Sequence, residues 1–381
     1  METLKTWCTP ISYVPARPAS NGEFPVTKRR ALIIAAALIL IVAVSFIILA
    51  LSRQPERIVL PTYSPTIGWL TAQPSDAGLK ADVLTRMVSD IKASSTQTRC
   101  SLVIKDGYLV LEEYYNGFTR NDTQSLYSCT KSVVSTLIGI AISEGKIKGV
   151  TEKLVDLLPS ETMEPWMKNI TLEKLLTMSA GFPGDDWLYD FKGLNEMLAS
   201  PDPLRYVLTR QKAFEPGSRF EYTDGVSHIL SCIISEKTGM SAAQYAEQKL
   251  FKPLGITTYT WSADPQGRSW GYARLKLQAT DMAKIGQLFL NEGSWDGVQV
   301  VPASWVREAT KHRINANLFQ GYGYQWWVDK DGWYTAMGYM GQFIMVFPKL
   351  NIVAVFTGGT PETYDYNVKL ANRFIIPAAS G

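Results

Sequence analysis

Ser128-Cys129-Thr130-Lys131-Ser132-Val133-Val134-Ser135 is the stretch that decides how this 381-residue chain is interpreted. It predicts a helix that starts near Ser128 and ends near Gly145, a residue type suited to a helix C-cap. Small residues fill the first turns and apolar residues follow them. This pattern is typical of a buried helix of which only the first turn lies in a cleft.

The spacing of Ser128 and Lys131 brings both side chains to one face of that first turn. A helix start also offers unpaired N–H groups and a positive dipole end. A serine hydroxyl is a weak nucleophile until a base removes its proton, and a partly desolvated lysine can act as that base or support one. Taken alone, S-x-x-K also occurs by chance, and Ser128 fits an ordinary N-cap. Cys129 lies about 100° further around the helix and is expected in the core.

A second segment, EPGSRFEYTDG at residues 215–225, opens another helical stretch. The Pro-Gly turn followed by an aromatic residue predicts that Tyr222 stands at a loop tip. A phenol has a pKa near 10, which an adjacent ammonium can lower enough to make a general base. The alternative is a core tyrosine, one of 18 in the chain.

A third segment, GYMGQ at residues 338–342, precedes a predicted strand. Glycines beside an edge strand allow a substrate to approach the backbone closely. The backbone N–H groups of Ser128 and Gln342 are therefore candidates for an oxyanion hole. The alternative is a simple turn that leads into the strand.

The order of the predicted elements indicates an α+β fold. A helix over 79–92 and a hairpin around Asp106-Gly107 come first, and residues 146–270 are mostly helical and loop-like. The hairpin strands are predicted at 101–105 and 108–115. After the helical region, strands are predicted at 322–328, 333–337, 342–347 and 352–357, followed by a helix at 364–376 that ends before Pro377. A sheet built from both chain ends with a helical insertion follows from this order.

The three segments together resemble the β-lactamase-related serine hydrolases, which include class C β-lactamases, DD-peptidases, family VIII esterases and 6-aminohexanoate-dimer hydrolases. Ser128 and Lys131 match the S-x-x-K motif, Tyr222 matches the tyrosine of Y-x-N, and Tyr339-Met340-Gly341 falls at K-T-G. Accessory stretches at 171–181, 251–256 and 279–306 look similar too, so the resemblance covers roughly 80–377. It implies a β-lactamase/transpeptidase-like fold: an antiparallel sheet flanked by the N- and C-terminal helices, plus an inserted helical domain, with the site between them.

Two positions depart from the family pattern. Asp224 stands where an asparagine is usual, and Tyr339 replaces the lysine that helps β-lactamases and DD-peptidases bind a substrate carboxylate. The expected activity is therefore hydrolysis of a small-molecule ester or amide. The alternative is the activity of a β-lactamase or a DD-peptidase. The residues expected around the substrate and oxyanion are Gln342, Gly341, Asp224 and Tyr339. If Asp224 lies by Lys131, its carboxylate should favour the ammonium form of the lysine.

The N-terminal part predicts a membrane anchor. Residues 31–51 hold 21 residues without a charge, enough for a helix of about 30 Å, and Lys28-Arg29-Arg30 precede them. The positive-inside tendency predicts a single-pass protein with residues 1–30 as a cytoplasmic tail and the catalytic domain on the extracytoplasmic side. Residues 52–75 are proline-rich and predict a linker to a hydrolase domain at 76–381. The alternative to a membrane anchor at residues 31–51 is a cleaved signal peptide.

Charge and composition exclude several functions. The first 51 residues hold five basic and two acidic residues, which accounts for the whole net charge of +3. A neutral main domain gives no electrostatic basis for nucleic-acid binding. Four cysteines without zinc spacing and only two histidines make a structural metal site unexpected, and the mechanism implied by the motifs requires no cofactor. No sequence pattern sets an oligomeric state.

Two rival functions remain open at this point. A Ser-His-Asp triad could use His228, although Ser128 does not stand in a G-x-S-x-G elbow. A membrane-tethered ligand-binding or sensor domain could also keep this fold without turnover. The altered third motif favours the sensor, whereas the intact Ser128, Lys131 and Tyr222 favour an enzyme.

Overall fold

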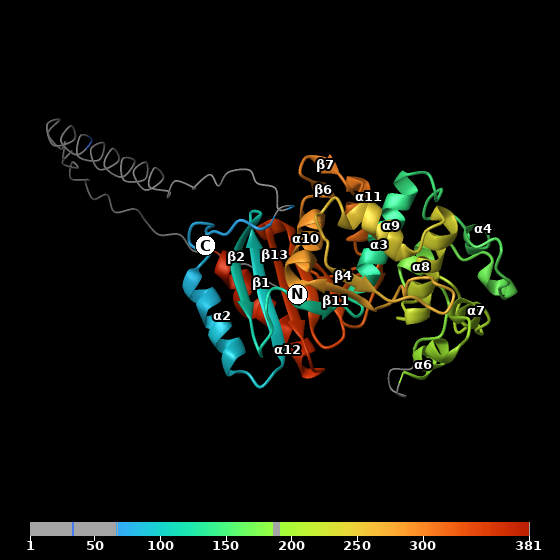
Figure 1. Cartoon of the computed structure of the whole chain (residues 1–381), viewed down its shortest axis with the longest axis horizontal. Coiled ribbons are helices and arrows are strands. Elements are labelled where there is room, and N and C mark those ends of the chain that lie inside the picture. Colours follow the sequence, from blue (N-terminus) through green and yellow to red (C-terminus); the bar gives the residue numbers. More distant parts are fainter. Residues whose placement is uncertain (1–32, 34–65, 67, 186–190, 381) are drawn as a thin grey trace, which may run out of the picture. The chain divides into compact units, whose positions relative to one another are not determined.

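The computed structural model describes residues 33, 66, 68–185 and 191–380 (Figure 1). Residues 1–57 and 58–381 form two separate units, and the second contains every element described below. Among the described residues, no helix is both long and apolar enough to cross a bilayer. The predicted span at 31–51 lies, except for residue 33, outside the described residues.

An eight-stranded antiparallel sheet forms the centre of the second unit. Its strand order is β2-β1-β13-β12-β11-β10-β9-β8. The first and last parts of the chain meet in it, because β1 pairs with β13. The strands are β1 (Thr98–Lys105), β2 (Tyr108–Tyr114), β8 (Ile314–Asn315), β9 (Gly321–Tyr322), β10 (Trp327–Val328), β11 (Tyr334–Gly338), β12 (Gln342–Phe347) and β13 (Ile352–Gly358). The α+β prediction with a sheet built from both chain ends is confirmed.

The hairpin between β1 and β2 turns at the two residues that the sequence indicated. Asp106 and Gly107 have φ values of 51° and 84°. Two successive positive φ values are the requirement of a type I′ turn, which glycine and aspartate tolerate better than other residues. The turn therefore fixes the register of the first two strands.

Helices cover the sheet. Every position of β12 and β13 is buried, so both faces of these strands are shielded from solvent. Helix α10 (Ala279–Leu290) contacts them closely at Gly286, where an added Cβ would lie 2.5 Å from Val353. Helices α2 (Ala81–Ala93) and α12 (Glu362–Leu370), from opposite ends of the chain, contribute the rest of the cover (Figure 1).

The middle of the chain forms a helical region beside the sheet (Figure 1). Helix α3 (Cys129–Ser143) joins the two parts, since it packs on α8 and on β11, and it is buried from Cys129 to Ala141.

The remaining helices of the described residues, inside and outside this region, are α4 (Leu154–Leu157), α5 (Leu172–Leu176), α6 (Lys192–Ala199), α7 (Pro203–Leu208), α8 (Asp224–Thr238), α9 (Ala242–Ala246), α11 (Ala303–Ala309) and α13 (Ile376–Ala379). Single turns at Pro165–Met167 and Pro348–Leu350 are 3-10, and those at Glu247–Phe251 and Ala371–Ile375 are π-helical.

Two small sheets were not predicted. The strands β3 (Thr123–Ser125), β5 (Leu275–Gln278) and β4 (Tyr259–Trp261) form a three-stranded sheet in this order. The strands β6 (Ser294–Trp295) and β7 (Val298–Gln299) pair in a short hairpin. Strands of two to four residues are too short to show a periodic pattern in a sequence.

Three predicted boundaries were wrong for local reasons. The predicted strand 322–328 is split into β9 and β10, because Gln325 has a φ of 62° and its N–H bonds the carbonyl of Leu176 instead of a neighbouring strand. The predicted helix near 225–250 is broken at Gly239, which has a φ of 73°. The last helix does not end before Pro377, because this proline falls in the first turn of α13, where its missing N–H is not needed.

The domain also begins before residue 76. Ala72 N–H donates to the carbonyl of Leu109, and Leu109 N–H donates to Leu70. The Trp69 indole donates to the carbonyl of Thr280. The part of the predicted linker that the structure describes, from residue 68 on, is therefore attached to the domain.

Candidate active site

Ser128 lies directly before α3, at a strained turn. Tyr127 has a φ of 44°, a left-handed conformation that costs a non-glycine residue energy and is found most often at functional sites. The preceding Leu126 is fixed by a hydrogen bond from its N–H to the carbonyl of Leu275 in the three-stranded sheet. The turn leaves Ser128 half-buried at the tip of an otherwise buried helix.

Lys131 makes three hydrogen bonds from a fully buried position. Its Nζ lies 2.8 Å from Ser128 Oγ, 2.5 Å from Asp224 Oδ1 and 3.0 Å from the carbonyl of Tyr272. An ammonium has three donors, and here each has an acceptor. Because only 1% of this side chain is exposed, the carboxylate of Asp224 is what makes a buried positive charge tolerable. The structure thus brings together Ser128, Lys131 and Asp224.

Tyr222 precedes α8 and is surrounded by aromatic rings. It stacks on Trp327 with ring centroids 5.7 Å apart, and the Nζ of Lys131 lies 4.8 Å from the centre of its ring. Burial and the carboxylate of Asp224 raise the pKa of Tyr222 well above its usual value, although its hydrogen bond with Ser128 acts in the opposite direction. The expectation that the neighbouring ammonium lowers this pKa was wrong. Burial among these rings and the carboxylate of Asp224 set the direction of the pKa shift, so Tyr222 is a phenol in the resting protein.

The third segment reaches the same place from the sheet. An added Cβ on Gly338 would lie 2.3 Å from the carbonyl of Leu126, so the end of β11 contacts the strand that leads to Ser128. The turn that follows includes Gly341, with a φ of 84°. The Gln342 side chain is buried and donates to the carbonyls of Tyr339 and Gly358, which fixes the turn. The Gln342 backbone lies beside α3, since Cys129 Sγ donates to its carbonyl at 3.5 Å.

Tyr339 occupies the rim of the site. Its side chain is 41% exposed, in contrast to the buried Gln342 and Gly341. Its ring packs edge-on against Tyr127 and Phe191, at centroid distances of 5.8 and 6.3 Å. Among the described residues, the position where related enzymes carry a lysine therefore presents aromatic rings beside Tyr127.

Two contributors to the site were not predicted. The backbone carbonyl of Tyr272 accepts from Lys131, and a carbonyl leaves no signal in a sequence. Asp185 is buried and accepts hydrogen bonds from the Thr223 hydroxyl and from the N–H of Asp224. Asp185 is one of many acidic residues in the sequence, and only the fold brings it to the start of α8.

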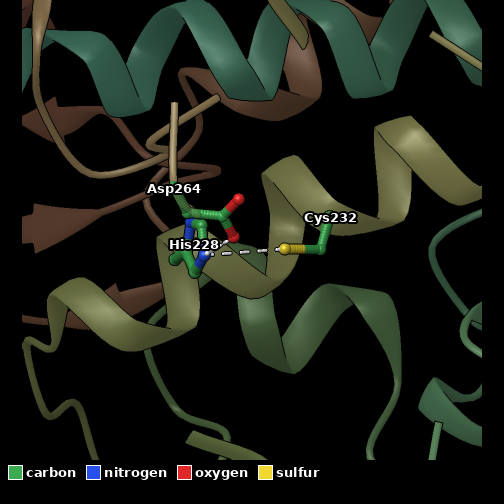
Figure 2. A group of neighbouring side chains, drawn as sticks. All are labelled: His228, Cys232 and Asp264. Carbon is green, nitrogen blue, oxygen red and sulfur yellow. Dashed lines mark hydrogen bonds and ion pairs between the residues drawn. The ribbon is translucent and has the colours of Figure 1, made fainter. Parts of the chain in front are cut away.

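One group of side chains in the described part of the chain has metal-ligand chemistry. His228 and Cys232 lie one turn apart on α8, and Asp264 faces them from the loop between β4 and β5 (Figure 2). His228 Nε2 is 3.2 Å from Asp264 Oδ2 and 3.8 Å from Cys232 Sγ. All three side chains are buried.

The surroundings of Asp264 do not fit a metal ion. Arg268 already supplies a positive charge, because its Nε donates to Asp264 Oδ2 at 3.0 Å and its backbone N–H donates to Oδ1. Burial raises the pKa of the Cys232 thiol, which keeps it protonated. Burial also lowers the pKa of His228, so the imidazole is neutral. The group is a hydrogen-bond network that holds the loop on α8.

The same network answers the rival Ser-His-Asp triad. His228 does have an aspartate partner, but its Nε2 lies within hydrogen-bond distance of Asp264 and Cys232. Ser128 Oγ instead accepts from Lys131. The proton partners of Ser128 are therefore those of the S-x-x-K arrangement.

Comparisons with known proteins agree with this geometry. Residues 101–371 match the sequence model of the family described as Beta-lactamase. The 6-aminohexanoate-dimer hydrolase of Paenarthrobacter ureafaciens is 23% identical over 316 residues, which cover 76% of this chain and 80% of that protein. A family VIII carboxylesterase structure aligns with a TM-score of 0.65 and 15% identity over 81% of this chain and 98% of its own. The octameric penicillin-binding protein homologue from Pyrococcus abyssi aligns with a TM-score of 0.62 and 18% identity over 77% of both chains.

The match to the family covers most of the second unit, including the strands of both chain ends and all three motif segments. The structural neighbours share the fold at low identity, as expected for a scaffold that hosts several hydrolytic activities. The chain belongs to the beta-lactamase-related family of serine hydrolases.

Proposed function

We propose that this protein hydrolyses a small carboxylic ester or amide through an acyl-enzyme on Ser128. The observation that carries the proposal is the pair of contacts of one buried ammonium, Lys131 Nζ to Ser128 Oγ at 2.8 Å and to Asp224 Oδ1 at 2.5 Å. A hydroxyl, an amine and a carboxylate in a row make a path along which the serine proton can leave. The 6-aminohexanoate-dimer hydrolase and family VIII carboxylesterase among its relatives have names that fit amide and ester substrates.

The first step forms the acyl-enzyme. Lys131 Nζ first gives a proton to Asp224, and the amine so formed takes the proton of Ser128 Oγ as this oxygen attacks the substrate carbonyl. The Tyr222 phenol, protonated in the resting protein, then donates its proton to the leaving oxygen or nitrogen as the bond to the acyl carbon breaks. The backbone N–H groups of Ser128 and Gln342 are the proposed donors to the oxyanion.

The second step returns every group to its starting state. The Tyr222 phenolate takes a proton from water, whose oxygen attacks the acyl carbon. Ser128 Oγ leaves and recovers its proton from Lys131, which regains one from Asp224. No metal ion or cofactor takes part in this scheme, and Lys131 is an ammonium at the start and at the end.

The aromatic rim favours substrates without a carboxylate next to the scissile bond. Tyr339, with Tyr127 and Phe191, presents aromatic edges where a lysine would attract that carboxylate. A neutral ester or amide loses nothing there, whereas penicillins and D-alanyl peptides lose an ion pair. We therefore place ester and amide hydrolysis ahead of β-lactam hydrolysis.

The test is turnover of a short-chain p-nitrophenyl ester by the full-length protein, beside Ser128→Ala and with nitrocefin as a second substrate. We expect ester turnover by the wild type and its loss in Ser128→Ala, by about 10³-fold or more, because the nucleophile is removed. The variant should keep its thermal unfolding midpoint. Turnover that survives in a folded Ser128→Ala protein would refute the proposal, and nitrocefin turnover would refute the preference for neutral substrates.

We also propose that residues 31–51 anchor the protein in a membrane, with the hydrolase domain outside the cytoplasm. The 21 uncharged residues after Lys28-Arg29-Arg30 support this arrangement. The full-length protein should stay with the membrane fraction after alkaline carbonate extraction, and a chain starting at residue 58 should not. Recovery of the full-length protein in the soluble fraction, at its full mass, would contradict the anchor.

A further inference from the structure

Asp185 is a buried carboxyl group that the proposed mechanism does not use. Only 2% of the residue is exposed. Its Oδ1 accepts from the Thr223 hydroxyl at 3.0 Å, and its Oδ2 accepts from the backbone N–H of Asp224 at 2.5 Å. Thr223 and Asp224 are the N-cap and the first residue of α8, so a side chain from a separate loop caps this helix.

The capped turn carries two residues of the proposed reaction. Tyr222 and Asp224 flank Thr223, and Asp224 in turn holds Lys131 at 2.5 Å. The Thr223 side chain makes no cap of its own, so Asp185 takes over the role that an N-cap side chain usually has. A shift of this turn would therefore move Tyr222 and Asp224 together relative to Ser128.

Asp185 also shapes the charge of the site. Burial and the neighbouring carboxylate of Asp224 raise the pKa of Asp185 to about 7, while the N–H of Asp224 and the charge of Lys131 oppose the rise. The carboxyl groups of Asp185 and Asp224 thus lie near the one ammonium of Lys131, and Asp185 acquires its negative charge only near neutral pH. Several titratable or charged groups among the described residues surround Asp185 and its loop. They are Asp224 and Tyr222 at the start of α8, Lys131 on α3, Tyr206 on α7, and Glu221 and Arg210 against Gly184 and Pro183.

We propose that Asp185 is a positioning residue that fixes Tyr222 and Asp224 around Lys131. The negative charge of Asp185, once formed, slows acyl transfer. The inference rests on the proposed function, because it concerns the same site. The charge slows the reaction since a second carboxylate disfavours both the phenolate of Tyr222 and the oxyanion of the acylation step.

Asparagine separates the two roles. Its carbonyl oxygen can accept from Asp224 N–H and its amide can donate to the Thr223 hydroxyl, so Asp185→Asn keeps the cap without the charge. Asp185→Ala loses both. A matched control is Asp281→Asn, since Asp281 is also buried and ion-paired with Lys284 on α10, at 2.9 Å, outside the described contacts of Ser128.

The experiment records kcat and KM of the full-length protein from pH 5.5 to 9 with the p-nitrophenyl ester. In the wild type and in Asp281→Asn, kcat/KM should fall roughly fivefold as the pH rises through about 7. In Asp185→Asn this pH-dependent step should be absent, and kcat should stay at the low-pH value of the wild type. Asp185→Ala should lose about tenfold or more in kcat, with KM changed less than about twofold. An unchanged step in Asp185→Asn, or full kcat in a folded Asp185→Ala, overturns the proposal.

Thermal unfolding tests the charge without using turnover. The folded protein holds a proton on Asp185 between about pH 4 and 7 that the unfolded chain has released, so this group makes unfolding easier as the pH rises through that window. The unfolding midpoint of the wild type should therefore fall relative to that of Asp185→Asn between pH 5 and 8. Equal pH dependence of the two overturns the inference about Asp185, whereas a wild type without turnover overturns the proposed function.

Discussion

At the scale of single residues, the site depends on one buried ion pair. Lys131 and Asp224 have side chains that are 1% and 10% exposed, and they meet at 2.5 Å. Removing one partner of such a pair typically costs about 3–5 kcal/mol of stability, because the other charge stays buried without compensation. A useful substitution at this pair must therefore keep a hydrogen-bond acceptor for the ammonium.

Asp224→Asn meets that condition and tests the proton path. The amide oxygen can still accept from Lys131, but it cannot take the proton that the lysine passes on. We expect kcat/KM to fall by about 10²–10⁴-fold, together with a changed pH–rate profile, in p-nitrophenyl ester assays. Asp281→Asn, which disturbs a comparable buried pair on α10, should leave both unchanged. A pH–rate profile identical to that of the wild type would show that Asp224 handles no proton.

At the scale of elements, the loop before β5 is pressed against α8. An added Cβ on Gly271 would lie 2.0 Å from the carbonyl of Ser227, and the Ser231 hydroxyl donates to the carbonyl of Ser269. This close approach delivers the Tyr272 carbonyl to Lys131 at 3.0 Å. The loop thus supplies the third acceptor of the ammonium through its backbone.

Gly271→Ala should therefore damage both stability and activity. The methyl group meets backbone atoms that cannot turn away, so we expect a loss of about 1–3 kcal/mol in chemical denaturation. The displaced Tyr272 carbonyl should also lower kcat at temperatures where the variant is still folded. The control is Gly193→Ala in α6. The nearest neighbour of its added Cβ is the flexible guanidinium of Arg210 at 3.1 Å, so this change should not destabilise the protein. Equal stability of the two variants would mean that the loop adapts.

At the scale of the whole molecule, the sequence predicts the frame better than the details. Periodic segments such as the helix of residues 81–93 and the strand of residues 342–347 were predicted within about two residues, because burial alone sets their pattern. The motif segments at Ser128, Tyr222 and Gln342 were found through the residue types that the chemistry requires. What escaped prediction depends on contacts between distant segments: Asp185 on α8, the Tyr272 carbonyl, and the aromatic shell that raises the pKa of Tyr222.

The pairing of β1 with β13 has a consequence for how this chain is made. Thr98 pairs with Gly358, 260 residues later, so the sheet cannot close until β13 has been synthesised. At about 5–20 residues per second, a ribosome needs roughly 13–50 s to synthesise that interval. During this time β1 and β2 can form their hairpin, but the edge of β1 has no neighbour. Such a high contact order predicts slow folding and a nascent chain that depends on protection from aggregation until β13 arrives.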